Sequence, residues 1–240
     1  MKDRKKLKVL LVQFRKSEIK DHELECVIKK AGLASEQIDT LNALEVDPIS
    51  EHLDGYDVLM LGGAGSYCIT EGGLRVLPNV YELVRQARKR KIPTLGICFG
   101  SHVLTVAFGG RLLNDKEGQE TGTFEVALTD QGKQDPVFSK LPEKFMAQLG
   151  HKDFIMQIPE GAQTLATSEL SGTQAWVFPN ELVYAIQFHP ELDEVGTQVR
   201  ATYYINQYFD SNPRVLKQAL DSIKPSPEAV KVFDYFLDQV

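Results

Sequence analysis

The sequence is poor in cysteine, and its few cysteines follow no regular spacing. Cys26, Cys68 and Cys98 are scattered along 240 residues. They form neither the close pairs of a zinc site nor the dense pattern of a disulfide framework. Thiols that stay free are typical of a reducing compartment. We therefore expect a cytoplasmic protein with no metal site.

Long hydrophobic runs and an excess of basic charge are also missing. No apolar stretch is long enough for a transmembrane helix, and the basic start at residues 2–8 leads into a short strand-like run at 9–12. The chain has 27 Lys and Arg against 33 Asp and Glu, a formal net charge of −6. This composition predicts neither nucleic acid nor a membrane as a partner.

Phosphate-binding loops, internal repeats and linkers are absent from the sequence as well. Gly62-Gly63-Ala64-Gly65 lacks the Lys-Ser/Thr ending that a P-loop requires. The hydrophobic content of 42% is that of an ordinary globular protein. We predict a single domain over residues 1–240, with a core at about 8–192 and a helical C-terminal extension at about 194–240.

Apolar runs alternate with helical patterns in the first half of the chain. Strands are expected at 8–14, 37–41, 56–61 and 92–97, and helices at about 21–31, 77–91 and 101–108. The second half has short strand patterns at 121–128, 146–149, 164–167, 173–178 and 183–188, then helices at about 194–209, up to 223, and from 226. The pattern predicts an α/β fold in three layers. Its doubly wound, mostly parallel sheet carries helices on both faces, added antiparallel strands and a helical C-terminal tail, with the site at the carboxyl ends of the strands.

One stretch has the pattern of a nucleophile elbow. Cys98 stands between a strand-like run and a helix-compatible run, with Gly96 two residues before it and Gly100 two residues after it. Small residues allow the tight, strained turn that lifts a side chain out of the edge of a sheet. The helix N-terminus that follows offers N–H groups to a developing oxyanion. A small buried cysteine in a glycine-rich loop fits this stretch equally well.

A second stretch offers a base and a carboxylate. His189 and Glu191 follow the apolar run at 183–188. Residues two apart on an extended backbone point to the same side, so Glu191 can accept from one ring nitrogen of His189 and leave the other for a thiol. The plainer alternative is a histidine that closes a strand beside an unrelated surface glutamate. Together with Cys98, the pair favours the triad chemistry of nucleophilic catalysis.

The two stretches together resemble the class I (triad) glutamine amidotransferases, nearest the stand-alone GMP-synthase-like members. The resemblance is carried by Gly96-Ile-Cys-Phe-Gly100 and Gln187-Phe-His-Pro-Glu191. Leu61-Gly-Gly-Ala-Gly-Ser66 is similar to the oxyanion loop of the family, Ser-Gly-Gly-Pro-Gly-Ser, and Gly150-His-Lys-Asp153 is similar to its Ser-His-Gly-Asp segment. The similarity runs from about residue 9 to residue 191.

The resemblance implies a role for each matching residue. Cys98 would be the nucleophile, His189 the general base and then the acid, and Glu191 the residue that orients His189. The backbone N–H groups of Gly63 and Phe99 would hold the oxyanion. The implied reaction cleaves the γ-amide of glutamine through a thioester, giving glutamate and ammonia, and requires no metal or organic cofactor. Because the chain has no synthetase domain, a synthetase partner would receive the ammonia.

Two positions depart from the family pattern. His102 stands where the family commonly has a glutamine that contacts the substrate, and Ala64 replaces the usual proline of the oxyanion loop. We take Gly62, His102, His151 and Asp153 as candidate substrate-binding residues. A tolerated helix histidine at 102 and a structural pair at 151 and 153 are the alternatives.

Three functions therefore stay open. The first is the glutamine-hydrolysing amidotransferase. The second is a free-standing γ-glutamyl hydrolase or peptidase acting on a γ-glutamyl conjugate, which the missing synthetase domain and His102 favour. The third is a catalytically silent binding or regulatory module, against which the intact Cys98, His189 and Glu191 argue.

Overall fold

The strands of the central sheet carry apolar side chains on both faces of the sheet. The computed structural model describes residues 2–114, 119–209 and 211–240. In β1 (Val9–Gln13), Val9 and Leu11 point into one hydrophobic core, while Leu10 and Val12 point into a second. A strand buried on both sides requires a covering layer on each face.

Nine strands of the described chain form one sheet in the order β2-β1-β3-β4-β11-β10-β9-β6-β7. The parallel part contains β1, β2 (Ile38–Asn42), β3 (Val58–Leu61), β4 (Thr94–Ile97) and β11 (Val183–Ile186). The antiparallel part contains β10 (Ala175–Val177), β9 (Gln163–Thr167), β6 (Glu120–Leu128) and β7 (Lys144–His151). A separate antiparallel ribbon pairs β5 (Arg111–Asn114) with β8 (Asp153–Gln157).

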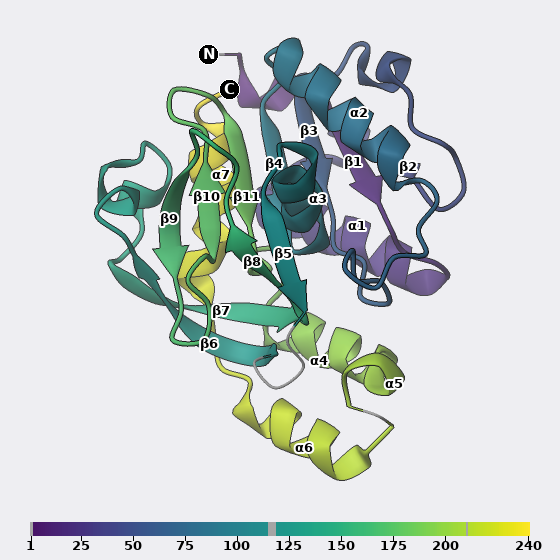
Figure 1. The fold of residues 1–240 in the computed structure, drawn as a ribbon, viewed down its shortest axis with the longest axis vertical. Helices are drawn as coiled ribbons and strands as arrows, with labels where there is room; N and C mark the ends of the chain where they lie inside the picture. Colours follow the sequence, from purple (N-terminus) through teal and green to yellow (C-terminus); the bar gives the residue numbers. More distant parts are fainter. Residues whose placement is uncertain (1, 115–118, 210) are drawn as a thin grey trace.

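Helices cover both faces of this sheet (Figure 1). The core on one side includes residues of α1 (Glu18–Ala31) and α7 (Pro227–Leu237). The core on the other side includes residues of α2 (Leu77–Lys89) and α3 (Phe99–Ala107). Short 3-10 turns η1 to η5 lie at Arg4–Lys6, Ser35–Gln37, Ser50–Leu53, Gly132–Gln134 and Phe138–Lys140. The three-layer α/β fold that the sequence predicts is confirmed.

The C-terminal extension has two parts. Helices α4 (Glu194–Tyr203), α5 (Ile205–Tyr208) and α6 (Pro213–Ser222) lie beyond the ends of the parallel strands, below the sheet in Figure 1. Helix α7 then returns to the sheet, so that the Lys2 N–H donates to the Val240 carbonyl at 3.1 Å. In the described residues no helix combines the length and apolarity needed to cross a membrane.

Three details differ from the sequence prediction. The helix expected at 194–209 breaks at Tyr204, whose φ of −96° and ψ of 27° leave the helical region while its ring is buried. The helix after Cys98 begins at Phe99 rather than at residue 101. The ribbon of β5 and β8 was not expected, because its strands are short and half-exposed and carry little alternation.

Candidate active site

The backbone at Cys98 has the strained conformation of an elbow. Cys98 follows β4 and precedes α3 with φ 51° and ψ −105°, a backbone conformation that residues other than glycine rarely adopt. A Cβ on Gly96 would lie 2.6 Å from the Gly100 carbonyl oxygen, and one on Gly100 would collide with the Leu61 carbonyl. Close packing of the start of α3 against β4 and β3 therefore requires both glycines. The thiol is buried, and its Sγ lies 3.7 Å from the Gly150 carbonyl oxygen.

His189 and Glu191 meet at the same edge of the sheet. Strand β11 pairs in parallel with β4, with Ile186 opposite Ile97, so both strands end level. His189 Nδ1 lies 2.8 Å from Glu191 Oε1, and both side chains are buried. The prediction of an extended backbone at these residues was wrong, because β11 ends at Ile186 and the two residues lie in the turn that follows. The turn brings the side chains together instead.

The charges of this pair stabilise each other. Burial alone would lower the pKa of His189, but Glu191 and then Cys98 raise it to about 9. Burial alone would raise the pKa of Glu191, but His189 and Arg200 hold it well below its usual range. Near neutral pH the pair is therefore an imidazolium beside a carboxylate.

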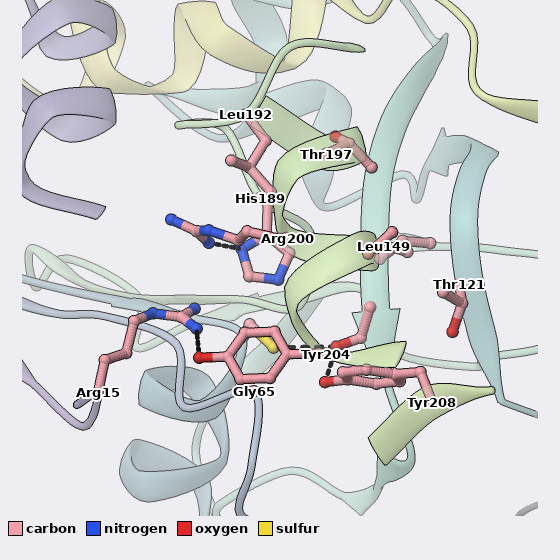
Figure 2. A pocket seen from close by; sticks show the side chains of 13 residues that line it. Arg15, Gly65, Thr121, Leu149, His189, Leu192, Thr197, Arg200, Tyr204 and Tyr208 are labelled. Carbon is pink, nitrogen blue, oxygen red and sulfur yellow. Dashed lines mark hydrogen bonds between the residues drawn. The ribbon is translucent and has the colours of Figure 1, made fainter. Parts of the chain in front are cut away.

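Cys98 and His189 line one small cavity of about 50 Å³, shown in Figure 2. A water molecule needs about 10–15 Å³ of such space, so the cavity holds only a few waters. A ligand as large as an amino acid requires one wall to move. Within the described residues, no group of three or more His, Cys, Asp or Glu side chains is arranged to hold a metal ion.

One wall of the cavity is formed by α4 and α5, which we call the cap (residues 194–208). Its residues Arg200, Tyr204 and Tyr208 are four apart and lie on one side of the cap, facing the cavity (Figure 2). Arg200 Nη1 donates to Glu191 Oε1 at 2.7 Å. The Tyr208 hydroxyl donates to the Gly150 carbonyl at 2.9 Å.

Tyr204 connects the cap to the loop after β3. Its hydroxyl accepts from Arg15 Nη1 at 2.8 Å, and its ring occupies the space that a Cβ on Gly65 would need. Arg15 Nε in turn donates to Glu23 Oε1 at 2.8 Å, in an ion pair that is almost fully buried. The cap is thus linked through Arg15 to the buried carboxylate of Glu23.

The two expected oxyanion donors differ in availability. The Gly63 N–H donates to Glu23 Oε1 at 3.0 Å. Phe99 is the first residue of α3, and no acceptor for its N–H is found among the described residues. A Cβ on Gly63 would lie 2.5 Å from Arg15 Nη2 and 3.2 Å from His189 Cε1, so the loop passes directly beside the imidazole.

A thiol on an elbow, a histidine and an orienting carboxylate form a triad suited to acyl transfer. The model of the family "Glutamine amidotransferase class-I" matches residues 22–209 of this chain. The chain belongs to the class-I glutamine amidotransferase family.

Individual relatives agree with this assignment. The chain is 26% identical over 171 residues to one of the subunits of "GMP synthase [glutamine-hydrolyzing]" of Methanococcus vannielii, covering 71% of this chain and 82% of that protein. It is 31% identical over 167 residues to "GMP synthase [glutamine-hydrolyzing]" of Lactobacillus delbrueckii subsp. bulgaricus, covering 69% of this chain but 29% of that longer protein. A glutamine amidotransferase from Thermotoga maritima superposes with a TM-score of 0.73 at 23% identity over 98% of this chain and 97% of that chain, which supports the fold.

The candidate substrate-binding residues of this amidotransferase are engaged with the protein itself. His102 Nε2 lies 2.7 Å from Gln187 Oε1, and burial lowers the pKa of His102 to about 4, so the neutral ring donates this bond. His151 contacts Glu120 through Nε2 and the Asp153 carbonyl through Nδ1. Asp153 accepts from Thr70 and Asn114 side chains. Gly62 packs directly on the carboxylate of Glu23.

Several residues at the site of this amidotransferase were not identified from the sequence: Arg15, Glu23, Lys152, Arg200, Tyr204 and Tyr208. The repeat of four between Arg200, Tyr204 and Tyr208 was visible in the sequence. Nothing in the sequence indicated that this side of the helix turns toward Cys98, because that depends on how the extension folds back over the strand ends.

Proposed function

We propose that this amidotransferase hydrolyses the γ-amide of glutamine with Cys98 as nucleophile. The observation that supports it most strongly is the elbow thiol of Cys98 in one cavity with His189, whose Nδ1 is held 2.8 Å from Glu191 Oε1. The sulfur of Cys98 attacks the amide carbon while His189, as an imidazolium beside Glu191, holds the proton of the thiol. The raised pKa of His189 favours this protonated ring.

Collapse of the tetrahedral intermediate breaks the C–N bond. His189 donates a proton to the leaving nitrogen, ammonia departs, and the glutamyl group stays on Cys98 as a thioester. A water molecule that loses a proton to His189 then attacks the thioester carbon. The C–S bond breaks, glutamate leaves, and the sulfur of Cys98 is restored beside the protonated His189. Glu191 keeps the ring oriented through both steps and stabilises its positive charge.

The N–H of Phe99 is the oxyanion donor that is ready in this conformation. The N–H of Gly63 becomes the second donor only after it leaves Glu23 Oε1. Such a donor contributes about a hundredfold or more in rate, so turnover depends on whether the loop that carries Gly63 releases its N–H from Glu23. His102, His151 and Asp153 serve this reaction as the inner wall of the site.

Ammonia formed in this reaction passes to a synthetase on a separate chain. The relatives that are named as single subunits of GMP synthase support this part of the proposal, since such a name describes one component of a larger synthase.

The decisive experiment measures glutamate release from L-glutamine by the purified chain and by Cys98→Ala. We expect the variant to lose about 10⁴-fold or more in kcat with an unchanged thermal melting curve. Cys68→Ala is the matched control, because Cys68 lies near Cys98 but burial raises its pKa to about 12, which keeps it an unreactive thiol. Turnover in Cys98→Ala at the level of the unaltered protein would refute the triad. Cys98-dependent release from γ-glutamyl peptides, with none from glutamine, would instead identify a γ-glutamyl hydrolase.

A further inference from the structure

Cys98 borders a second small cavity, of about 20 Å³, on the other side of Tyr208. Its lining includes His102, Asp153 and Lys152. Tyr208 and Gly150 line both cavities, and the Tyr208 hydroxyl donates a hydrogen bond to the Gly150 carbonyl. Displacement of the Tyr208 ring would join the two spaces into one pocket around the thiol.

Both arginines that line these cavities, or contact their lining, are paired with carboxylates. Arg15 pairs with Glu23, and Arg200 pairs with Glu191. Lys152 differs from both arginines, because no carboxylate lies within ion-pair distance of its ammonium among residues 2–114, 119–209 and 211–240.

Lys152 is instead held by the cap. Its Nζ donates to the backbone carbonyl of Gln207 and lies 5.4 Å from the centre of the Tyr208 ring. A carboxylate carries a full negative charge that attracts the ammonium, whereas the Gln207 carbonyl offers only a dipole. A carboxylate that enters the cavity therefore competes well with the Gln207 carbonyl for this ammonium.

We propose that Lys152 binds a carboxylate of the substrate and thereby determines specificity. The inference rests on the proposed function, since it assigns the carboxylate to the glutamyl compound that Cys98 attacks. Transfer of Nζ from Gln207 to this carboxylate also removes a contact that holds α5 in place. Substrate binding thus favours displacement of Tyr208 and joins the two cavities.

Two carboxylates could supply this ligand chemistry. One is the α-carboxylate of the glutamyl group, which L-glutamine carries. The other is a carboxylate on the leaving group, as in γ-glutamylglycine. A set of four compounds separates them: L-glutamine, 4-aminobutanamide (which lacks the α-carboxylate), γ-glutamylglycine, and 4-aminobutanoylglycine (which keeps only the leaving-group carboxylate).

The test measures calorimetric binding of these compounds to the Cys98→Ala chain, with and without Lys152→Gln. We expect Lys152→Gln to weaken the binding of γ-glutamylglycine, which carries both carboxylates, about tenfold or more and to leave the binding of 4-aminobutanamide, which carries neither, unchanged. Lys152→Arg should restore most of the affinity. The control is Lys140→Gln, which removes a lysine 5.2 Å from the Tyr235 ring, away from the site, and should change nothing.

Each outcome has one meaning. If Lys152→Gln also weakens the binding of 4-aminobutanoylglycine, the ligand of Lys152 is the leaving-group carboxylate. If it weakens the binding of only the compounds that carry the α-carboxylate, the ligand is the carboxylate of the glutamyl group. An equal effect of Lys152→Gln on the binding of 4-aminobutanamide and γ-glutamylglycine, including no effect on either, overturns the proposal, as does failure of every carboxylate compound to bind. Hydrolysis by the unaltered chain is measured separately, so a failure of the proposed reaction is distinguished from a failure at Lys152.

Discussion

At the scale of single residues, one carboxylate oxygen organises the triad. Glu191 Oε1 lies 2.8 Å from His189 Nδ1 and 2.7 Å from Arg200 Nη1. Two positive groups on one buried oxygen keep the carboxylate ionised, and the carboxylate in turn keeps the imidazole protonated. Arg200 is thus a positioning residue, which acts on His189 through Glu191.

Glu191→Gln should therefore lower the pKa of His189 from about 9 toward its ordinary value of 6.5. The glutamine oxygen can still accept from the ring but carries no charge. Turnover should fall, by less than in Cys98→Ala, because the base is still present. NMR titration of the imidazole measures the pKa directly. Glu120→Gln removes the charge from the other buried His–Glu pair, with His151, and should leave the pKa of His189 unchanged. An unchanged His189 pKa in Glu191→Gln would contradict this account of the pair.

At the scale of elements, the position of the cap depends on a glycine as well as on hydrogen bonds. Gly65 has φ +70°, and its missing side chain makes the space that the Tyr204 ring fills. The ring then brings the Tyr204 hydroxyl to Arg15. The loop after β3 and the start of the C-terminal extension are therefore fitted to each other.

Gly65→Ala should displace the cap. The new Cβ meets the Tyr204 ring at a φ that alanine adopts only with strain, about 1–2 kcal/mol. Gly55→Ala is the matched control, because Gly55 has φ +85° and open space around the added Cβ. We expect chymotrypsin to cleave the cap faster in Gly65→Ala than in Gly55→Ala, and urea unfolding to show a larger loss of stability. Equal behaviour of the two variants would mean that the cap does not depend on this contact.

At the scale of the whole molecule, the site is built where three parallel strands end. Gly62 and Gly63 follow β3, Cys98 follows β4, and His189 comes just after β11. These strands are buried on both faces, so the core fixes their relative positions to the precision of packed side chains. The protonation of His189 is consequently linked to global stability.

The folded chain should lose stability as pH rises from 6.5 to 9. The pKa of His189 is about 9 when folded and ordinarily 6.5, so in this window the folded state binds more protons than the unfolded state. The stabilisation is complete below pH 6.5 and is lost as pH passes 9. Urea unfolding is compared between Cys98→Ala and the double variant Cys98→Ala/His189→Gln. Without the thiol in either chain, the difference in stability reports the protonation of His189 alone. The stability difference between the two should shrink across the window by less than about 3 kcal/mol, because Cys98 no longer helps to raise the pKa of His189. A difference independent of pH would contradict the raised pKa.

The sequence by itself determined the alternation of elements and pointed to Cys98, His189 and Glu191 as the proposed triad. Continuous apolar runs can be satisfied only by strands buried on both faces, and Gly96 and Gly100 beside Cys98 mark a backbone that approaches its neighbours closely. The prediction of one domain over residues 1–240 remains a prediction.

Only the tertiary structure decided what surrounds the triad. Arg15, Lys152, Arg200 and Tyr204 come from distant parts of the chain and meet because the extension after Glu191 folds back over the strand ends. Packing of α1 and α3 against the sheet brings the Gly63 N–H to Glu23 and His102 to Gln187. Local patterns encode which element a residue joins, whereas the partners of a buried polar group depend on which elements pack against it.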